Sequence, residues 1–260
     1  HKFDPISQKE YYQLAATLTG VTHGERSVHV DLTDEQQQRL AEIEVGLTKQ
    51  RAELARIEHA ARSLVLTKRT ERTVPLPEPP QALATWEFED DLKDSLGTLD
   101  ATTYGSAKIE DGCLVLDGKD SYAATAPLAV DLFEKTLEAW VQLETLEQRG
   151  GGVISVQTLD GATFDAIVFG EQEPEKWMAG SNGFMRTRSF KGIAEADAMD
   201  RIVHIAVVYQ KDGTIIGYRD GAPYGSSYRA DELSLYPARK SQVIFGLRHS
   251  PATGNRMMAG

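Results

Sequence analysis

Residues 201–221, RIVHIAVVYQKDGTIIGYRDG, carry the clearest strand pattern in the chain. Within residues 203–209 apolar side chains occupy both phases of a period-2 pattern, which is typical of a central strand covered on both faces. Asp212-Gly213 follows, and glycine tolerates the positive φ that a tight hairpin turn needs. We therefore predict that residues 203–209 and 214–219 form a hairpin around which the neighbouring segments pack.

The period-2 pattern recurs through residues 82–260, between turns rich in Asp-Gly and glycine. In residues 136–143, for example, Leu137, Ala139 and Val141 point one way while Glu138 and Trp140 point the other. Many short strands with almost no helical periodicity predict a mainly β fold, an antiparallel sandwich or barrel. Besides the hairpin, the predicted strand segments are residues 83–88, 107–116, 136–143, 152–159, 163–169 and 242–247.

Residues 1–72 have helical periodicity instead. Ser7 is a predicted N-cap for a helix over residues 7–18, and Thr33 for a long helix over residues 34–64. Apolar residues of the long helix recur at spacings of three and four, as in a coiled coil. We favour the interpretation that this apolar stripe packs against another helix of the parent protein. The alternative is that it forms a coiled coil with a second copy of itself. Its members are Leu40, Ile43, Leu47, Leu54, Ile57, Ala61 and Leu64.

Residues 73–81 are rich in proline, which cannot continue a helix and favours extended structure. We interpret them as a short, stiff linker. The sequence therefore predicts a helical segment over residues 1–72, a linker over residues 73–81 and a β domain over residues 82–260.

The 260 residues have a formal net charge of −11, which argues against nucleic acid as the main partner because phosphate binding needs a basic face. No apolar run approaches the roughly 20 residues that span a bilayer. The single cysteine, Cys113, excludes a disulfide within this chain, and we expect it to be a small buried hydrophobe. The chain begins at His1 rather than Met, so we expect it to be a piece of a longer protein.

Aromatic and basic residues gather in the second half of the chain, as they do on surfaces that stack against sugar rings and bind their hydroxyls. They predict a polysaccharide-binding groove, with an anionic glycan favoured by the arginines. In the alternative, the aromatic rings fill the core and the arginines pair with Glu171, Glu173 and Glu175. The predicted binding residues are Trp177, Arg186, Arg188, Tyr224 and Tyr228, with Phe184 and Phe190 as neighbours.

Acidic turns form a second candidate, because carboxylate oxygens are the ligands that calcium prefers. Their spacing does not match an EF-hand loop, and solvated turns are the alternative. The candidate calcium ligands are Glu89, Asp90, Asp94, Asp117 and Asp120. His204 lies on a predicted strand without a second histidine nearby, so we expect a hydrogen-bonded core histidine.

Five motifs occur in a characteristic order through residues 82–260, and together they resemble a laminin G-like, concanavalin A-like domain. They are WEFED at residues 86–90, residues 118–122, LEAWV at 137–141, HIAVVY at 204–209 and YRDG at 218–221. The resemblance implies a two-sheet jelly-roll sandwich. It also implies one further strand, after Gly260, that pairs beside the first strand. We therefore expect the domain in this chain to lack its last strand and to leave a sheet edge unpaired.

The N-terminus, HKFDPISQKEYY, is similar to the segment that directly follows a haem-attaching CxxCH in large cytochrome-c-containing proteins of planctomycete-type bacteria. In that family a laminin G-like domain follows a helical segment. The resemblance implies an exported protein, periplasmic or extracellular, with haem c attached upstream of His1. No cofactor is then expected in this chain, apart from the candidate calcium.

Residues 195–200, EADAMD, resemble the ExDxxE motif of laminarinase-like glycoside hydrolases, in which strand alternation aims the carboxylates into one cleft. Here the last member is Asp200 and the surrounding residues are not strand-like, so we expect a loop or a short helical turn. The sequence predicts a non-catalytic binding module, for carbohydrate or protein, in an exported c-type cytochrome-like protein. A domain that only spaces or shields the haem domains is the alternative, and a hydrolase is the least favoured.

Overall fold

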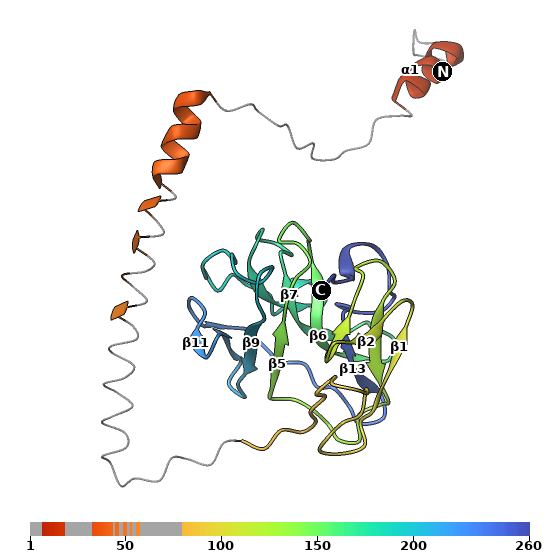
Figure 1. The fold of residues 1–260 in the computed structure, drawn as a ribbon. Coiled ribbons are helices and arrows are strands. Elements are labelled where there is room, and N and C mark those ends of the chain that lie inside the picture. The colour runs from red at the N-terminus through yellow and green to blue at the C-terminus, as the bar shows by residue number, and fades with distance from the viewer. Residues whose placement is uncertain are drawn as a thin grey trace. The chain divides into compact units, whose positions relative to one another are not determined.

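The computed structural model describes residues 7–18, 33–43, 45–46, 49–50, 53, 56–57 and 80–260 (Figure 1). The chain divides into two units, His1–Glu78 and Pro79–Gly260. None of the helices in the described part of the chain has the length and apolar character that a bilayer crossing requires.

Capping residues begin both helices of the first unit, as predicted. Helix α1, Gln8–Leu18, starts with a capping box in which the Glu10 amide donates to the Ser7 hydroxyl, 3.3 Å away, and the Ser7 amide donates to the Glu10 carboxylate, 2.7 Å away. Thr33 and Gln36 form the same arrangement at the start of the next helix. Residues 34–43 are helical, and so is each described residue from 45 to 57.

The heptad stripe is described at Leu40, Ile43 and Ile57, all of which are exposed. Its other members, Leu47, Leu54, Ala61 and Leu64, lie outside the described residues, as does most of the predicted linker. A coiled coil over residues 34–64 stays a prediction.

The second unit is a sandwich of two antiparallel sheets with a small third sheet (Figure 1). The six-stranded sheet has the order β1-β4-β13-β6-β7-β8, formed by Ala101–Tyr104, Tyr122–Thr125, Ser241–Phe245, Gly151–Thr158, Phe164–Phe169 and Trp177–Ser181. The second sheet has the order β11-β10-β9-β5, formed by Ala222–Pro223, Thr214–Arg219, Val203–Tyr209 and Lys135–Val141, and β12, Tyr228–Arg229, also pairs with β10. The third sheet is the hairpin of β2, Lys108–Glu110, and β3, Cys113–Val115. Two short 3₁₀ helices, η1 at Asn182–Phe184 and η2 at Gly254–Arg256, complete the described elements of this unit.

The predicted hairpin of β9 and β10 lies in the second sheet, with β9 between β10 and β5. Its central position is confirmed, but its predicted cover on both faces is wrong. Val203, Ile205, Val207 and Tyr209 are buried in the core between the sheets. On the opposite face His204 and Val208 are half-buried and Ala206 is buried, so the apolar residues there reflect a sheet surface rather than a second core.

The predicted strand at residues 83–88 is also wrong, since the chain makes one isolated bridge there, between Trp86 and Asp94. The buried Asp94 carboxylate accepts backbone N–H groups from Thr85 and Leu96, 3.0 and 3.1 Å away, and organises a loop in place of a ladder. The remaining predicted strands are present with boundaries shifted by one or two residues. Strands β1, β4, β8, β11 and β12 were not predicted.

The chain after β13 folds back over the outer face of the six-stranded sheet. The Ser155 hydroxyl in β6 is within hydrogen-bonding distance of the carbonyls of Leu247 and Arg248, 3.0 and 2.7 Å away. This close approach requires glycine at position 152, because a Cβ there would lie 2.4 Å from the Cα of Arg248. We call residues 247–257 the covering segment, and it supplies one wall of the pocket described below.

Candidate functional site

The predicted sugar-binding set does not form a surface. Trp177, Arg186 and Tyr224 are 2, 4 and 5% exposed, Tyr228 is half-buried and Arg188 alone is exposed. Trp177 is buried because strand alternation in β8 turns its ring into the core against Phe169, with ring centroids 4.8 Å apart. Trp177 and Phe190 therefore fill the core, as the alternative interpretation of this set predicted, whereas Phe184 is 49% exposed.

Arg186 pairs with a residue that the sequence did not indicate. Its Nε donates to Asp165 Oδ1, 2.7 Å away, and Lys135 Nζ lies 2.8 Å from Asp165 Oδ2. All three side chains are at most 4% exposed, and the ammonium group of Lys135 also lies over the rings of Tyr209 and Tyr236. We call Lys135, Asp165 and Arg186 the Asp165 cluster; it is a charged group within the sandwich core.

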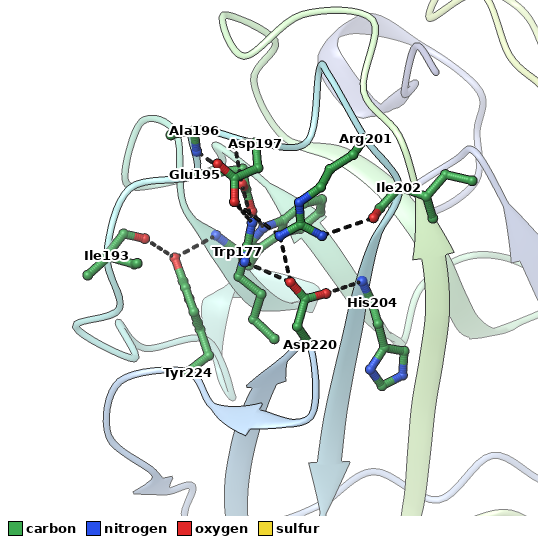
Figure 2. A network of polar contacts seen from close by, with 11 residues as sticks. Trp177, Ile193, Glu195, Ala196, Asp197, Arg201, Ile202, His204, Asp220 and Tyr224 are labelled. Carbon is green, nitrogen blue, oxygen red and sulfur yellow. Dashed lines mark hydrogen bonds and ion pairs between the residues drawn. The ribbon is translucent and has the colours of Figure 1, made fainter. Parts of the chain in front are cut away.

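Glu195, the first carboxylate of the hydrolase-like motif, is completely buried in a polar network (Figure 2). Its carboxylate accepts the indole N–H of Trp177 at 2.7 Å and two N–H groups of Arg219 at 2.8 Å. The backbone amides of Ala196 and Asp197 donate to the same carboxylate, at 3.0 and 2.9 Å. The five hydrogen bonds fix residues 195–197 against β8 and β10.

This network leaves Glu195 unsuited to donate a proton. Burial by itself raises the pKa of Glu195, but the hydrogen bonds from Arg219 and Trp177 lower it to about 2. Asp197 is instead half-exposed and pairs with Arg201 and Arg219, each at 3.0 Å. The expected loop at residues 191–200 is confirmed, and without a strand the carboxylates are not aimed into one cleft.

The five candidate calcium ligands do not gather at one site in the described part of the chain. Asp117 and Asp120 share the hydroxyl of Ser106, and a hydrogen bond from the Ser121 hydroxyl helps to hold the pKa of Asp117 well below its usual range. Glu89 and Asp90 are exposed, and Asp94 is occupied by its own loop. In the described ranges no three such side chains are grouped to hold a metal ion, and calcium binding stays a prediction.

Two further predictions need correction. Cys113 is exposed, because the β2–β3 hairpin is a sheet of its own and does not bury this position. His204 is hydrogen-bonded as expected, with Nε2 2.7 Å from Glu138 Oε1, but it lies on the outer face of β9 and not in the core.

A cavity of about 400 Å³ lies on the outer side of the six-stranded sheet, between η1 and the covering segment. We call it the Phe164–His249 pocket. Residues from three separate parts of the chain supply its chemistry: Phe164 and Glu171 from β7 and the turn after it, Asn182 and Phe184 from η1, and Arg248 and His249 from the covering segment.

A flat stack of rings forms part of the lining. The rings of Phe164 and His249 have centroids 4.2 Å apart and an interplanar angle of 12°. Burial lowers the pKa of His249, so the ring is neutral near pH 7. Its Nδ1 lies 2.8 Å from the carbonyl oxygen of Ser250, which favours the tautomer with the proton on Nδ1 and leaves Nε2 as an acceptor.

A buried ion pair forms another part of the lining of the Phe164–His249 pocket. Arg248 Nη1 lies 2.5 Å from Glu171 Oε1, and the two side chains are 12 and 5% exposed. Burial raises the pKa of Glu171, against the opposing effect of Arg248. Arg248 Nε and Glu171 Oε2 have no hydrogen-bond partner within the described residues, so the pair retains one unused donor and one unused acceptor.

Phe184, at the rim, presents a half-exposed ring from a residue with a φ of 56°. Behind the rim, Arg186 Nη2 donates to Asn182 Oδ1 at 2.8 Å and to the Phe164 carbonyl at 3.0 Å. Arg186, which the sequence indicated as a binding residue, therefore supports the pocket from behind. The sequence missed Phe164, Asn182, Arg248 and His249 because no local pattern links these segments.

Several solved structures are similar to this chain at low sequence identity. The botulinum neurotoxin serotype D binding domain is 9% identical, with a TM-score of 0.42 over 68% of this chain and 45% of that one. A heptameric SAP-like pentraxin from Limulus polyphemus is 12% identical (TM-score 0.37; 56% and 70% covered), and a lichenase from a mouse hindgut metagenome is 11% identical (0.35; 56% and 72%). The chain thus spans less than half of the neurotoxin chain.

No curated protein matches the sequence. A family model described as the concanavalin A-like lectin/glucanases superfamily matches residues 117–257, which is more than half of the chain and contains strands β4 to β13. The two antiparallel sheets agree with that assignment. This chain therefore belongs to the concanavalin A-like lectin/glucanase superfamily.

Proposed function

We propose that residues 80–260 form a non-catalytic carbohydrate-binding module whose site is the Phe164–His249 pocket. The observation that carries the proposal is the combination, in one cavity, of a flat ring stack, a half-exposed Phe184 ring and a buried ion pair. Sugars present apolar C–H faces and hydroxyl groups, which such a lining matches. Its size also falls within the range of about 300–1,000 Å³ for small-molecule sites.

The charge of the pocket favours a neutral sugar. Arg248 is compensated by Glu171 at 2.5 Å, and the other arginine nearby, Arg186, is compensated by Asp165. A ligand carboxylate or sulfate would therefore meet no uncompensated cation. This differs from the anionic glycan that the arginines in the sequence favoured.

Binding without cleavage is the activity that this lining supports. Glycoside hydrolases use a pair of carboxyl groups, one on each side of the scissile bond. Glu171 is the one carboxylate among the residues lining the pocket, and it is engaged by Arg248. We therefore expect no hydrolysis of a bound oligosaccharide.

The test is isothermal titration calorimetry of the whole chain against a panel of neutral oligosaccharides. Phe184→Ala should weaken binding about fivefold, since it removes one aromatic contact worth about 1 kcal/mol. Leu235→Ala is the control, because Leu235 is 51% exposed and does not line the pocket. Equal affinity of the Phe184 variant and the native chain would refute the pocket, and no binding to any sugar would favour a spacer or shield domain.

The wider setting is proposed from the N-terminal resemblance. In that setting the module belongs to an exported c-type cytochrome-like protein, periplasmic or extracellular, with haem c attached upstream of His1. Residues 1–72 then link the haem part to the sandwich. The gene sequence upstream of His1 tests this, because a CxxCH motif is required there.

A further inference from the structure

An Asn-Gly pair, Asn182-Gly183, lies in the lining of the Phe164–His249 pocket, at the start of η1. Asparagine is among the less durable side chains, because its amide carbon can react with the backbone nitrogen of the next residue. A following glycine favours that attack, since it has no Cβ to obstruct it. Of the two asparagines in the sequence, Asn182 precedes glycine and Asn255 precedes arginine.

The fold leaves the Asn182-Gly183 bond open to the surface. Gly183 is exposed and Asn182 is half-buried. A Cβ built on Gly183 would meet no atom closer than Met185 Cγ, 3.9 Å away. Gly183 has a φ of 57°, which glycine adopts without strain. The backbone at Gly183 therefore has room to move toward the side chain of Asn182.

The oxygen and the nitrogen of the Asn182 amide group are held differently. Oδ1 accepts a hydrogen bond from Arg186 Nη2 at 2.8 Å, and the Phe164 backbone nitrogen lies 3.5 Å from the same oxygen. Nδ2 donates to Met185 Sδ at 3.7 Å, and a thioether sulfur is a weak acceptor. The oxygen is thus fixed against a buried cation, whereas the nitrogen contacts a side chain that is 68% exposed.

This arrangement favours attack at Asn182 Cγ. The guanidinium group of Arg186 draws electron density from the carbonyl and stabilises the negative charge that develops on Oδ1 when a nucleophile adds. Arg186 is held in place for this, because its Nε donates to Asp165 Oδ1 at 2.7 Å. The nitrogen that must leave has only the weak contact with Met185 to break.

We propose that Asn182 is a site of self-modification, at which the chain converts asparagine to aspartate and isoaspartate. The Gly183 nitrogen forms a bond to Asn182 Cγ and gives up its proton as ammonia leaves, which produces a five-membered cyclic imide. Water then opens the imide at either carbonyl. One product keeps the normal backbone, and in the other the backbone runs through the side chain. The sum is the loss of one ammonia, the gain of one water and one new negative charge.

The modification changes the pocket in two ways. A carboxylate replaces the Asn182 amide beside Arg186, in a lining where Glu171 is otherwise the one carboxylate. Isoaspartate also adds one atom to the backbone two residues before Phe184, so the ring at the rim must shift. We expect both changes to weaken binding, and this expectation rests on the function proposed for the pocket. The pocket then loses its ligand as the molecule ages, without unfolding.

Peptide mapping by mass spectrometry tests the modification on the whole chain, incubated for increasing times in mildly alkaline buffer. We expect residue 182 to convert to aspartate and isoaspartate while Asn255, which is also exposed, stays asparagine. Asn182→Gln should abolish the conversion, because the same attack on glutamine has to close a six-membered ring. The chain unfolded in guanidinium chloride gives the reference rate for the same sequence without the fold.

Two results would overturn the proposal. One is an Asn182 that stays intact in the folded chain over a time in which the unfolded chain converts it, because the fold then protects this bond. The other is conversion of Asn255 as fast as Asn182, because the selectivity argued from Gly183 and Arg186 is then absent.

Calorimetry with the oligosaccharide panel measures the consequence for the pocket. The fraction of chains that bind with the original affinity should fall in step with conversion, whereas aged Asn182→Gln should keep the affinity that it has when fresh. Asn182→Asp carries the new charge without the extra backbone atom and separates the two effects. Unchanged binding by a fully converted chain would refute the effect on the pocket. Failure of the proposed function is distinguishable, since a fresh chain that binds no sugar is still converted at residue 182.

Discussion

Removing the negative charge of the Asp165 cluster should destabilise the sandwich strongly. In Asp165→Asn the side chain keeps its size, but Lys135 and Arg186 lose their shared counter-charge. These three side chains are 0, 2 and 4% exposed, so water cannot replace the lost interaction. Breaking a buried ion pair on one side costs about 3–5 kcal/mol, and we expect the free energy of unfolding to fall by that amount.

The loss should also depend on pH, because the variant can relieve it by releasing a proton. Burial already lowers the pKa of Lys135, and Asp165 opposes this effect. Without Asp165 the folded state should lose the Lys135 proton more readily than the unfolded chain does. The unfolded state then binds more protons, so the stability of the variant should rise with pH toward the ordinary lysine pKa of about 10.4.

Urea unfolding of the whole chain, followed by tryptophan fluorescence at pH 6 and pH 9, measures both effects. Asp160→Asn is the matched control, because Asp160 is an exposed carboxylate in the turn before β7 and should contribute less than about 1 kcal/mol. A loss below about 1 kcal/mol for Asp165→Asn would refute the reasoning on buried charge. Equal losses at the two pH values would refute the role given to Lys135.

Three other perturbations test the described contacts. Gly152→Ala should destabilise the chain by about 1–3 kcal/mol in urea unfolding and weaken pocket binding, because its Cβ would meet the backbone of Arg248. Glu195 has its pKa lowered to about 2 from 4.5, so its stabilisation is complete above pH 4.5 and should be lost as the pH falls toward 2; Glu195→Gln should flatten that part of a stability–pH curve. His249 has a lowered pKa, so the unfolded chain binds more protons below about pH 6.5. Stability should fall as the pH drops through that range, and His249→Asn should remove this contribution.

Elements whose structure depends on neighbouring residues could be predicted from the sequence. Elements whose structure depends on contacts with distant residues could not. The β9–β10 hairpin follows from local alternation and an Asp-Gly turn, and it was predicted correctly. Residues 83–88 have a similar local pattern, but the buried Asp94 carboxylate accepts the Thr85 backbone amide, which a strand would use in its ladder. Strand β8 was missed because its Trp177 looked like a surface ring, and burial of that ring depends on the opposite sheet.

The candidate sites illustrate the same limit. Arg186 attracted notice as a cation near aromatic residues, yet its partner Asp165 lies 21 positions earlier in the chain and gives no local signal. The pocket joins Phe164, Asn182 and Arg248 through the sheet and the covering segment. Alternation alone correctly placed Trp140 on the opposite side of its strand from Leu137 and Val141, which are buried. Its exposure depends on what lies over that face, which strand periodicity does not specify.

The covering segment also has a consequence for how the pocket is acquired during synthesis. Ser155 hydrogen-bonds to carbonyls 92 and 93 residues later in the chain, and Gln157 bonds to Ser250 across a similar interval. Contacts between such distant positions form slowly, since a long loop must close first. The ring stack and the ion pair cannot exist until residues 248 and 249 have left the ribosome and docked on β6. A sugar ligand of the pocket would therefore bind chains whose covering segment has docked and pass over shorter nascent chains, which makes it a reagent for timing that docking step.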